Sequence, residues 1–299
     1  MRKLLFVINP IAGDTDKGLA LAEIEQFCSE RGWNSQVLKT TGQDDAARIE
    51  QAMSDFSPDT VVAGGGDGTV NLVARLLLGK DCRLGVLPLG SANGLATELG
   101  ISKNVPEALD VLHSGKVVEM DALLVNGEHY CFHLADIGYN AKLIQSFEEE
   151  GQRGQLGYAR QFLRTMRERP VNRYHIEAGG RRFKQVAVMI TFANARRYGT
   201  GAVINPKGQM DDGRFEVCIF HPWPRWYLLW LGFLFFIGRL EESRYVKILS
   251  VREVQVSSSG PLPLQVDGEL LGERREVQVE MAEEKVGVWA PVESGKRRI

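Results

Sequence analysis

Residues 60–78 read TVVAGGGDGTVNLVARLLL, a short apolar run followed by glycines and then by a second apolar stretch. The run Thr60–Ala63 predicts a buried strand, and Val70–Leu78 predicts a helix. Glycines between them let the backbone take positive φ angles and approach a phosphate with no Cβ atom in the way. The helix that follows would direct its free N–H groups and its dipole at an anion. The stretch therefore predicts a phosphate-binding turn at the end of a strand.

Two better-known glycine motifs are excluded. No GxxxxGK[ST] sequence occurs in the chain, and Thr69 stands where the third glycine of GxGxxG would be required. Asp67 cannot bind a phosphate by charge, so it is expected to act through a metal or a polar group of a nucleotide. A glycine-rich turn that binds nothing is the alternative.

Short strands and amphipathic helices alternate on both sides of this turn. The predicted strands are Leu4–Ile8, Ser35–Leu38, Thr60–Ala63 and Arg83–Leu87, and the predicted helices are Gly18–Arg31, Asp44–Met53 and Val70–Leu78. Alternation at this pitch predicts a doubly wound α/β domain, in which helices cover both faces of a parallel sheet. Ligands in such sheets bind beyond the carboxyl ends of the strands.

The pattern changes after about Val117, where strands dominate. The predicted strands are Ala122–Val125, His129–Leu134, Tyr174–Ala178, Gln185–Thr191, Arg214–Phe220, Val246–Val256 and Glu276–Met281. Two helices interrupt them, at Tyr158–Glu168 and Trp226–Ile237. This pattern predicts a separate all-β domain, antiparallel and sandwich-like, with a boundary near residues 120–130.

The amino-acid composition limits the number of domains and the classes of binding partner that are expected. The 299 residues suit two domains, and 44% apolar with 25% charged residues allow real cores. The chain has 36 Lys and Arg residues and 38 Asp and Glu residues, so it has no overall positive charge that would attract nucleic acid. No nucleic-acid partner is expected. The four cysteines are scattered without metal-ligand spacing, as expected for a reducing cytoplasm. The apolar run Leu4–Ile8 ends at Asn9-Pro10, too early for a secretory signal.

Six stretches, in this order, resemble the diacylglycerol kinase catalytic-domain family, which includes sphingosine kinases and bacterial lipid kinases. The first four are Asn9–Gly13, similar to an NPxxG loop, Thr40, residues 65–71 (GGDGTVN), and Pro88–Asn93, similar to PxG[ST]xN. The resemblance implies nucleotide contacts by Asn9, Pro10, Gly13, Thr40, Gly65, Gly66, Asp67, Gly68, Thr69, Asn71, Ser91 and Asn93.

The last two stretches lie in the β-rich part. Tyr198–Gly201, followed by Asp211–Gly213, is similar to the family's YGGG…DDG stretch, and this implies a structural magnesium ion near Asp212. Val266–Glu269 resembles the DGE motif that supplies the catalytic carboxylate. One position departs from many bacterial members, because Gly94 stands where they carry an aspartate. This leaves the substrate class open.

The resemblance implies an ATP-dependent lipid kinase that uses ATP and Mg²⁺ and transfers the γ-phosphoryl group to a lipid hydroxyl in a cleft between the two domains. The ion needs hard oxygen ligands, for which Asp67 and Asp121 are candidates. Asp267 and Glu269 lie two residues apart, so one can accept the hydroxyl proton while the other orients it. We favour Asp267 as the base with Glu269 assisting, and the reverse assignment stays open.

The expected domains are an α/β nucleotide-binding domain over residues 1–122, to which the segment of about 284–299 returns, and a β-rich lipid-substrate domain over residues 123–283. The sequence does not identify the lipid acceptor, which can be diacylglycerol, a sphingoid base, phosphatidylglycerol or an unusual membrane alcohol. Two other functions also stay open, an enzyme resembling NAD kinase and a non-catalytic regulatory protein that binds lipid or nucleotide. A homo-oligomer is open as well.

The most apolar stretch is Trp223–Ile237, which is shorter than the roughly 20 residues of a spanning helix. Its aromatic residues and the flanking Arg239, Arg244 and Lys247 suit an interfacial anchor near anionic headgroups. A core helix or an oligomer interface is the alternative, and Lys296–Arg298 is expected to be a solvated tail. The expected location is cytoplasmic, with peripheral association to a membrane.

Overall fold

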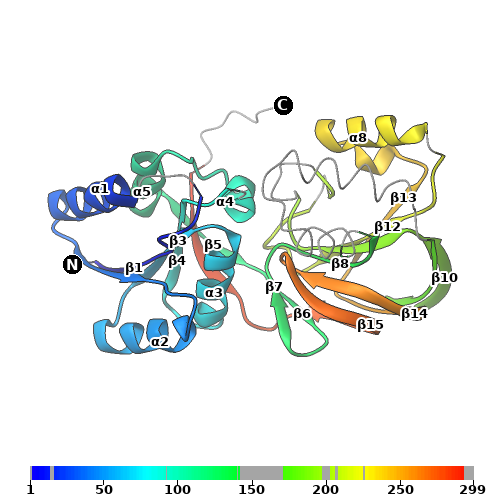
Figure 1. The fold of residues 1–299 in the computed structure, drawn as a ribbon, viewed down its shortest axis with the longest axis horizontal. Coiled ribbons are helices and arrows are strands. Elements are labelled where there is room, and N and C mark those ends of the chain that lie inside the picture. The colour runs from blue at the N-terminus through cyan, green and yellow to red at the C-terminus, as the bar shows by residue number, and fades with distance from the viewer. Residues whose placement is uncertain are drawn as a thin grey trace. The chain divides into compact units, whose positions relative to one another are not determined.

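The computed structural model describes residues 2–13, 17–91, 93–139, 141, 171–196, 203–205, 208–224 and 226–292 (Figure 1). The chain forms two compact units, one made of Met1–Met120 with Glu284–Ile299 and the other of Asp121–Glu283. Three sequence predictions, the helix Tyr158–Glu168, the Tyr198–Gly201 stretch and the tail Lys296–Arg298, lie outside the described residues.

The first unit is built on a six-stranded sheet in the order β2-β1-β3-β4-β16-β5. Its strands are β1 (Lys3–Ile8), β2 (Asn34–Lys39), β3 (Thr60–Gly65), β4 (Arg83–Pro88), β5 (Lys116–Met120) and β16 (Val286–Ala290). All neighbouring strands are parallel except β16 and β5. The predicted parallel sheet is confirmed. The chain leaves β1 for β2 on one side and then adds β3 on the other, which creates the switch point where α/β sheets bind ligands.

Helices cover both faces of this sheet, as the continuous burial of Leu4–Ile8 requires (Figure 1). Helices α1 (Lys17–Glu30) and α5 (Val105–Ser114) lie together on one face, and α2 (Asp45–Phe56) and α3 (Asp67–Leu77) lie on the other. The short helix α4 (Gly94–Leu99) follows β4.

The second unit is a ten-stranded antiparallel sheet, which confirms the predicted all-β class. Its path runs β13-β12-β11-β8-β14-β15-β6-β7, with β9 on β14 and β10 on β9. The strands are β6 (Leu123–Val125), β7 (His129–Cys131), β8 (Leu134–Gly138), β9 (Asn172–Ala178), β10 (Arg181–Ala187), β11 (Met189–Ala193), β12 (Phe215–Phe220), β13 (Val246–Val251), β14 (Glu253–Val266) and β15 (Glu269–Met281). The long strand β14 pairs with β9 near its start and with β8 at its end, so it joins two parts of the sheet.

Three predicted strands are each two strands in the structure. The predicted strand Gln185–Thr191, for example, is divided at Val188 between β10 and β11. The division follows the pairing, because β10 pairs with β9 whereas β11 pairs with β8 and β12. His129–Leu134 and Val246–Val256 are divided in the same way, between β7 and β8 and between β13 and β14.

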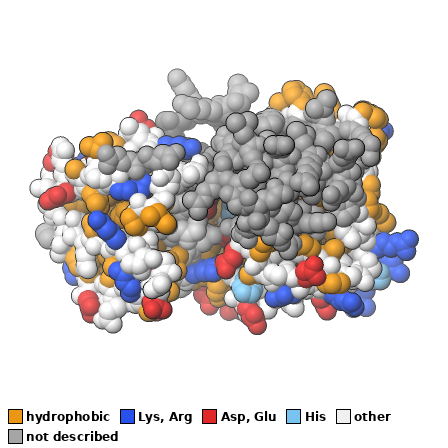
Figure 2. Space-filling view, viewed as in Figure 1, with side chains coloured by type: hydrophobic (Ala, Val, Ile, Leu, Met, Phe, Trp, Pro, Cys, Tyr) orange, Lys and Arg blue, Asp and Glu red, His pale blue; other side chains and the backbone are white. Residues whose placement is uncertain are grey.

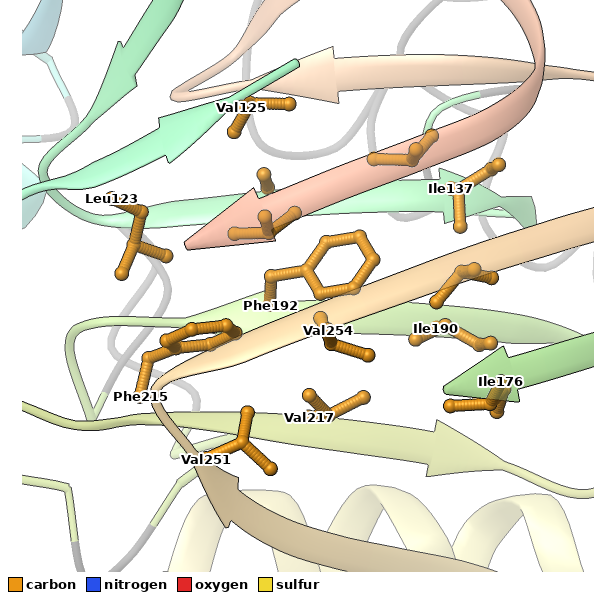
Figure 3. Close-up of a cluster of buried hydrophobic side chains, with 14 of the residues drawn as sticks. Leu123, Val125, Ile137, Ile176, Ile190, Phe192, Phe215, Val217, Val251 and Val254 are labelled. Atoms are coloured by element: carbon orange, nitrogen blue, oxygen red, sulfur yellow. The ribbon is translucent and has the colours of Figure 1, made fainter. Parts of the chain in front are cut away.

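Strand β11 is buried on both faces, and its alternate residues enter two different cores. Ile190 and Phe192 point into a cluster with Phe215, Val217 and Val254, which is drawn in Figure 3. Met189 and Ala193 point the other way, into a second cluster that includes residues of helix α8 (Tyr227–Ile237). The sheet therefore has a helix packed on its second face.

Helix α8 confirms the predicted helix at Trp226–Ile237. Among its described side chains, Tyr227 and Leu231 belong to the second cluster, and Leu234 is also buried. Trp226 (68%), Trp230 (51%), Phe233 (49%) and Ile237 (42%) are exposed. Hydrophobic side chains are visible at the surface where this helix lies (Figure 2). Within the described part of the chain, no helix combines the length and the apolarity needed to cross a bilayer.

Candidate functional site

Three loops meet at the carboxyl ends of β1, β3 and β4. The backbone N–H of Asn9 donates to the carbonyl of Gly64 at 2.8 Å. The N–H groups of Leu89 and Gly90 both donate to the carbonyl of Gly65 at 3.1 Å. The sheet therefore joins the NPxxG-like loop, the glycine turn and the PxG[ST]xN-like loop by direct backbone hydrogen bonds.

Two glycines allow these loops to come so close. A Cβ atom on Gly13, whose φ is +54°, would lie 2.6 Å from the carbonyl oxygen of Leu89. A Cβ atom on Gly90 would overlap the Cα atom of Gly66 and lie 2.8 Å from its nitrogen. Such contacts are too short for any side chain, so backbone packs on backbone here. The result is a cradle of main chain, which is the surface that phosphate-binding turns use.

Helix α3 begins at the bottom of this cradle. Its N-terminal residue is Asp67, and Gly66 is the cap, whose carbonyl accepts the N–H groups of Thr69 and Val70. The side chain of Thr69 is buried against Gly65, where an added Cβ atom would lie 2.7 Å from that of Thr69. The positive end of the helix dipole thus lies at the glycine turn, as the sequence predicts.

Asp67 and Gly94 are close in space. One carboxylate oxygen of Asp67 accepts the backbone N–H of Leu95 at 3.3 Å, in the first turn of α4. Gly94, the position that departs from many family members, is buried at the start of the same helix. Asp67 therefore supplies a carboxylate at the place where Gly94 brings no side chain.

Asn93 shapes the third loop from within. It is buried with φ near +55°, and its side-chain amide donates to the carbonyl of Gly90 at 2.6 Å. Its amide oxygen accepts the N–H of Gly90 at 3.0 Å. Both ends of the amide are thus used to close the turn that leaves Ser91 exposed. The predicted contact between Asn93 and a nucleotide stays a prediction, and the structure gives this side chain a turn-holding role.

The remaining predicted nucleotide residues surround the same strand ends. The amide oxygen of Asn9 accepts the N–H of Ile11 at 3.1 Å, which begins the first loop, and Pro10 is exposed on it. Thr40 follows β2, and its N–H donates to the carbonyl of Ile8 at 3.0 Å. Asn71 lies half-buried one turn along α3.

Lys17 is a candidate that the sequence analysis missed. Its ammonium group donates to the carbonyl of Ala12 at 2.5 Å and lies 3.4 Å from that of Leu89. The side chain thus connects the first and third loops and brings a positive charge to the edge of the cradle. A cation four residues after Gly13, at the start of the following helix, was the available signal.

The predicted catalytic carboxylates lie in the second unit, at the turn from β14 to β15. Asp267 has φ near +49°, and its carboxylate accepts the backbone N–H of Phe132 at 2.8 Å, of His133 at 2.9 Å and of Leu134 at 3.0 Å. The thiol of Cys131 also donates to it, at 3.3 Å. Burial, together with the negative charge of Asp267, raises the pKa of the Cys131 thiol well above its usual value. Glu269, which opens β15, is exposed.

The predicted metal ligands of the second unit also accept hydrogen bonds from backbone N–H groups. Asp121 is buried, and its carboxylate accepts the N–H of Gly213 at 2.7 Å. Its own N–H donates to the carbonyl of Met210 at 2.7 Å. Asp212 is exposed and accepts the N–H of Arg214 at 3.0 Å. Among the described residues, no three His, Cys, Asp or Glu side chains are gathered closely enough to hold a metal ion by themselves.

A surface cavity of about 390 Å³ lies elsewhere on the second unit, between the β9–β10 hairpin and strands β14 and β15. Its lining is His175, Ile176, Glu177, Arg182, Phe183, Lys184, Gln255, Ser257 and Glu276. None of these is a predicted site residue, so the cavity is a separate feature.

Comparisons with known proteins agree with this arrangement. The model of the diacylglycerol kinase catalytic domain matches residues 3–125. The model of the YegS C-terminal domain, described as NAD kinase beta sandwich-like, matches residues 135–288. Lipid kinase YegS of Escherichia coli (strain K12) is 30% identical over 222 residues, which cover 72% of this chain and 73% of its own.

Solved structures show the same fold. A diacylglycerol kinase from Bacillus anthracis str. Sterne superposes with a TM-score of 0.74 at 19% identity, over 97% of both chains. An NAD kinase from Archaeoglobus fulgidus, in complex with ATP, superposes with a TM-score of 0.53 at 11% identity, over 96% of this chain and 93% of its own. The two family models and the bacterial relative together show that the chain belongs to the diacylglycerol kinase catalytic-domain family, with a second domain of the YegS type.

Proposed function

We propose that the protein is an ATP-dependent lipid kinase that transfers the γ-phosphoryl group of ATP to the hydroxyl group of a membrane lipid. One observation carries the proposal: the main-chain cradle at the ends of β1, β3 and β4 is closed by Gly13 and Gly90, in a chain of this family. Phosphoryl transfer requires mainly positioning and neutralisation of charge. A cradle of backbone with a helix start and a lysine at its edge suits both demands.

On the nucleotide side, the first turn of α3 and the ammonium group of Lys17 would attract the phosphates of ATP. Magnesium usually takes one or two carboxylates together with waters and substrate phosphates, so a single carboxylate at the cradle fits this ion. Asp67 would hold it, and the ion would neutralise charge on the transferred group. Asp121 remains a second candidate ligand, and Asp212 remains a candidate for a structural magnesium ion.

On the acceptor side, the turn with Asp267 and Glu269 would supply the base that removes the proton of the lipid hydroxyl. The relative from E. coli is named a lipid kinase and the B. anthracis protein a diacylglycerol kinase, so diacylglycerol is the first acceptor to test. Sphingoid bases, phosphatidylglycerol and other membrane alcohols follow it. The reaction in a cleft between the two domains stays a prediction.

Helix α8 would bring the enzyme to its substrate. Its exposed side carries Trp226, Trp230 and Phe233, and the rings of Trp230 and Phe233 lie 5.3 Å apart. Aromatic residues of this kind favour the interface between water and lipid. Arg244 and Lys247 lie a few residues further along the chain and suit anionic headgroups. We therefore propose peripheral association with the cytoplasmic face of a membrane.

Vesicle flotation tests this association. Replacing Trp230 and Phe233 together by serine should reduce binding to phosphatidylglycerol-containing vesicles while leaving the melting temperature unchanged. Val186→Ser, a matched loss of an exposed apolar residue on β10, should leave binding unchanged. Equal binding by the double variant and the unmodified protein would exclude the helix as the anchor.

The kinase proposal is tested with Mg²⁺, γ-labelled ATP and a panel of lipids in mixed micelles, with label counted in the organic phase. Asp67→Asn should abolish transfer, whereas Asp81→Asn, the same change at an exposed turn of the first unit, should not. A parallel reaction with NAD as acceptor addresses the likeness to NAD kinase, which at 11% identity concerns the fold alone. Label in NAD but in no lipid would overturn the proposal, and nucleotide binding without transfer to either would point to a regulatory protein.

A further inference from the structure

The surface cavity of about 390 Å³ lies on the outer face of the sheet formed by β10, β9, β14 and β15. Alternate residues of β9 and β14, among them Ile176 and Val256, are buried in the cluster of Figure 3. The residues between them lie on the opposite face of the sheet. His175 and Ser257 are two of these outward residues, and both line the cavity. The positions of the lining side chains are therefore set by strand pairing.

Strand pairing places four lining residues in one line across the sheet. Lys184 on β10 lies opposite His175 on β9, and His175 lies opposite Ser257 on β14. Ser257 in turn lies opposite Glu276 on β15. Neighbouring strands are about 4.8 Å apart, so Lys184 and Ser257 are separated by roughly 10 Å of backbone with His175 between them. One small group above His175 is within reach of all three side chains.

The two carboxylates of the cavity already have donors from the protein. Arg182 donates to both oxygens of Glu177, at 2.8 and 3.2 Å, and the side chain of Gln255 donates to Glu276. The groups that face the other end of the line differ. Within the part of the chain that the structure describes, no hydrogen bond or ion pair engages the side chains of Lys184, His175 and Ser257. The unused polar groups of the cavity are therefore an ammonium group, an imidazole ring and a hydroxyl group.

These unused groups define the chemistry of a ligand. An ammonium group can only donate hydrogen bonds, and a hydroxyl group and an imidazole ring can donate as well. A partner for all three must bring several acceptors, and negative charge strengthens each bond. We propose that the cavity binds the phosphate group of a small phosphomonoester through Lys184, His175 and Ser257. Glu276 lies at the other end of the line, so its charge keeps the phosphate group toward Lys184. The volume of the cavity leaves room for a small polar body beside the phosphate group.

The place of the cavity in the second unit favours a water-soluble ligand over a lipid headgroup. Helix α8 packs on the outer face of β11 and β12 through the second cluster. The cluster of Figure 3 lies between these strands and the pair β9 and β14, so α8 and the cavity are on opposite sides of this unit (Figures 1 and 3). If α8 rests on a membrane as proposed, the cavity faces away from it. The choice of source rests on that proposed association, whereas the phosphate site itself does not.

Titration of the full chain with glycerol 3-phosphate, followed by amide NMR signals, tests the site. The signals of His175, Lys184 and Ser257 should shift together and give one dissociation constant. Lys184→Met should weaken this binding by about tenfold through loss of a charge-assisted hydrogen bond, whereas Lys184→Arg should retain most of it. Lys116→Met, the same change at an exposed position of β5 in the first unit, should have no effect. Shifts confined to the glycine turn at residues 64–68, or equal binding by Lys184→Met, would overturn the proposal.

Flotation with vesicles that contain phosphatidic acid, a lipid with a phosphomonoester headgroup, decides the source of the phosphate group. Lys184→Met should float with these vesicles as well as the unmodified protein does, because the cavity faces away from the membrane. A loss of flotation in Lys184→Met would overturn the water-soluble source and assign the site to a lipid headgroup. Neither experiment measures phosphoryl transfer. A protein that binds glycerol 3-phosphate here but phosphorylates no lipid would therefore keep this site and lose the proposed kinase function.

Discussion

Replacing Gly68 by alanine tests whether a nucleotide approaches the start of α3. The fold itself gives no reason for a glycine at this position, because its φ is not positive and an added Cβ atom would meet nothing within 4 Å. Gly90 differs in this respect, since a side chain there would overlap Gly66. A glycine that the fold does not need, in the first turn of a helix, points to a requirement of the ligand.

The expected effects on stability and on binding are opposite in sign. Alanine is favoured over glycine in helices by roughly 0.5–1 kcal/mol, so the melting temperature should stay constant or rise by about 1–4 °C. If phosphates bind as proposed, the added methyl group would occupy the space through which a phosphate reaches the backbone. If it removes a single phosphate contact of about 1.4 kcal/mol, the affinity for Mg-ATP falls about tenfold.

Isothermal titration with Mg-ATP and a thermal melt of the same sample measure both quantities. Gly260→Ala serves as the control, because it also adds a methyl group in open space but lies on β14 in the second unit. An unchanged affinity in Gly68→Ala would show that the phosphates do not approach this turn. A loss of affinity together with a loss of stability would show that the fold needs the glycine, which would refute the reasoning equally.

Three other substitutions test separate parts of the structure. Gly90→Ala should destabilise the first unit by about 1–3 kcal/mol through overpacking against Gly66, as measured by denaturant unfolding. Lys17→Met removes the ammonium group from the first and third loops, so Mg-ATP affinity should fall and should depend less on salt in titrations at about 50 and 300 mM NaCl. Burial raises the pKa of Glu216 in the folded state, so the folded protein binds this proton more tightly than the unfolded chain does. The contribution of this group to the free energy of unfolding therefore falls as pH rises above the ordinary carboxyl pKa of 4.5. Glu216→Gln keeps an acceptor for Asn205, and it should raise the melting temperature at about pH 7 more than at about pH 4.

The fold of the first unit can be predicted from its sequence because the patterns that indicate each strand are local. The apolar runs of β1, β3 and β4 are continuous, and each is followed by turn residues. These turns lie beside one another at the carboxyl ends of the strands. Helix α5 escaped prediction although its start has a recognisable cap, in which the side chain of Asn104 accepts the N–H of Glu107. Strand β5 was not predicted because most of its residues are exposed and its partner is β16, far along the chain.

The site follows from the sequence only in part. Motif spacing predicts which residues lie close together, but it does not predict which hydrogen bonds each side chain forms. The partners of Asp267 lie more than 130 residues away, so a carboxylate held by three backbone N–H groups and a solvent-exposed carboxylate look alike in the sequence. The same is true of Asn93, whose two hydrogen bonds to Gly90 depend on a left-handed backbone that no spacing rule predicts.

Gly94 shows how one missing carboxylate can change the electrostatics of the cradle. An aspartate at the start of α4 would place a second negative charge near Asp67, and both would face the phosphates of a nucleotide. In this chain, the N–H of Leu95 donates to Asp67, so one oxygen is partly neutralised by a helix start. In the proposed enzyme, repulsion toward ATP would fall, but the magnesium ion would lose a possible ligand. The ion would then depend more on the phosphates and water, and this would favour a metal that arrives with the nucleotide over one held by the free protein.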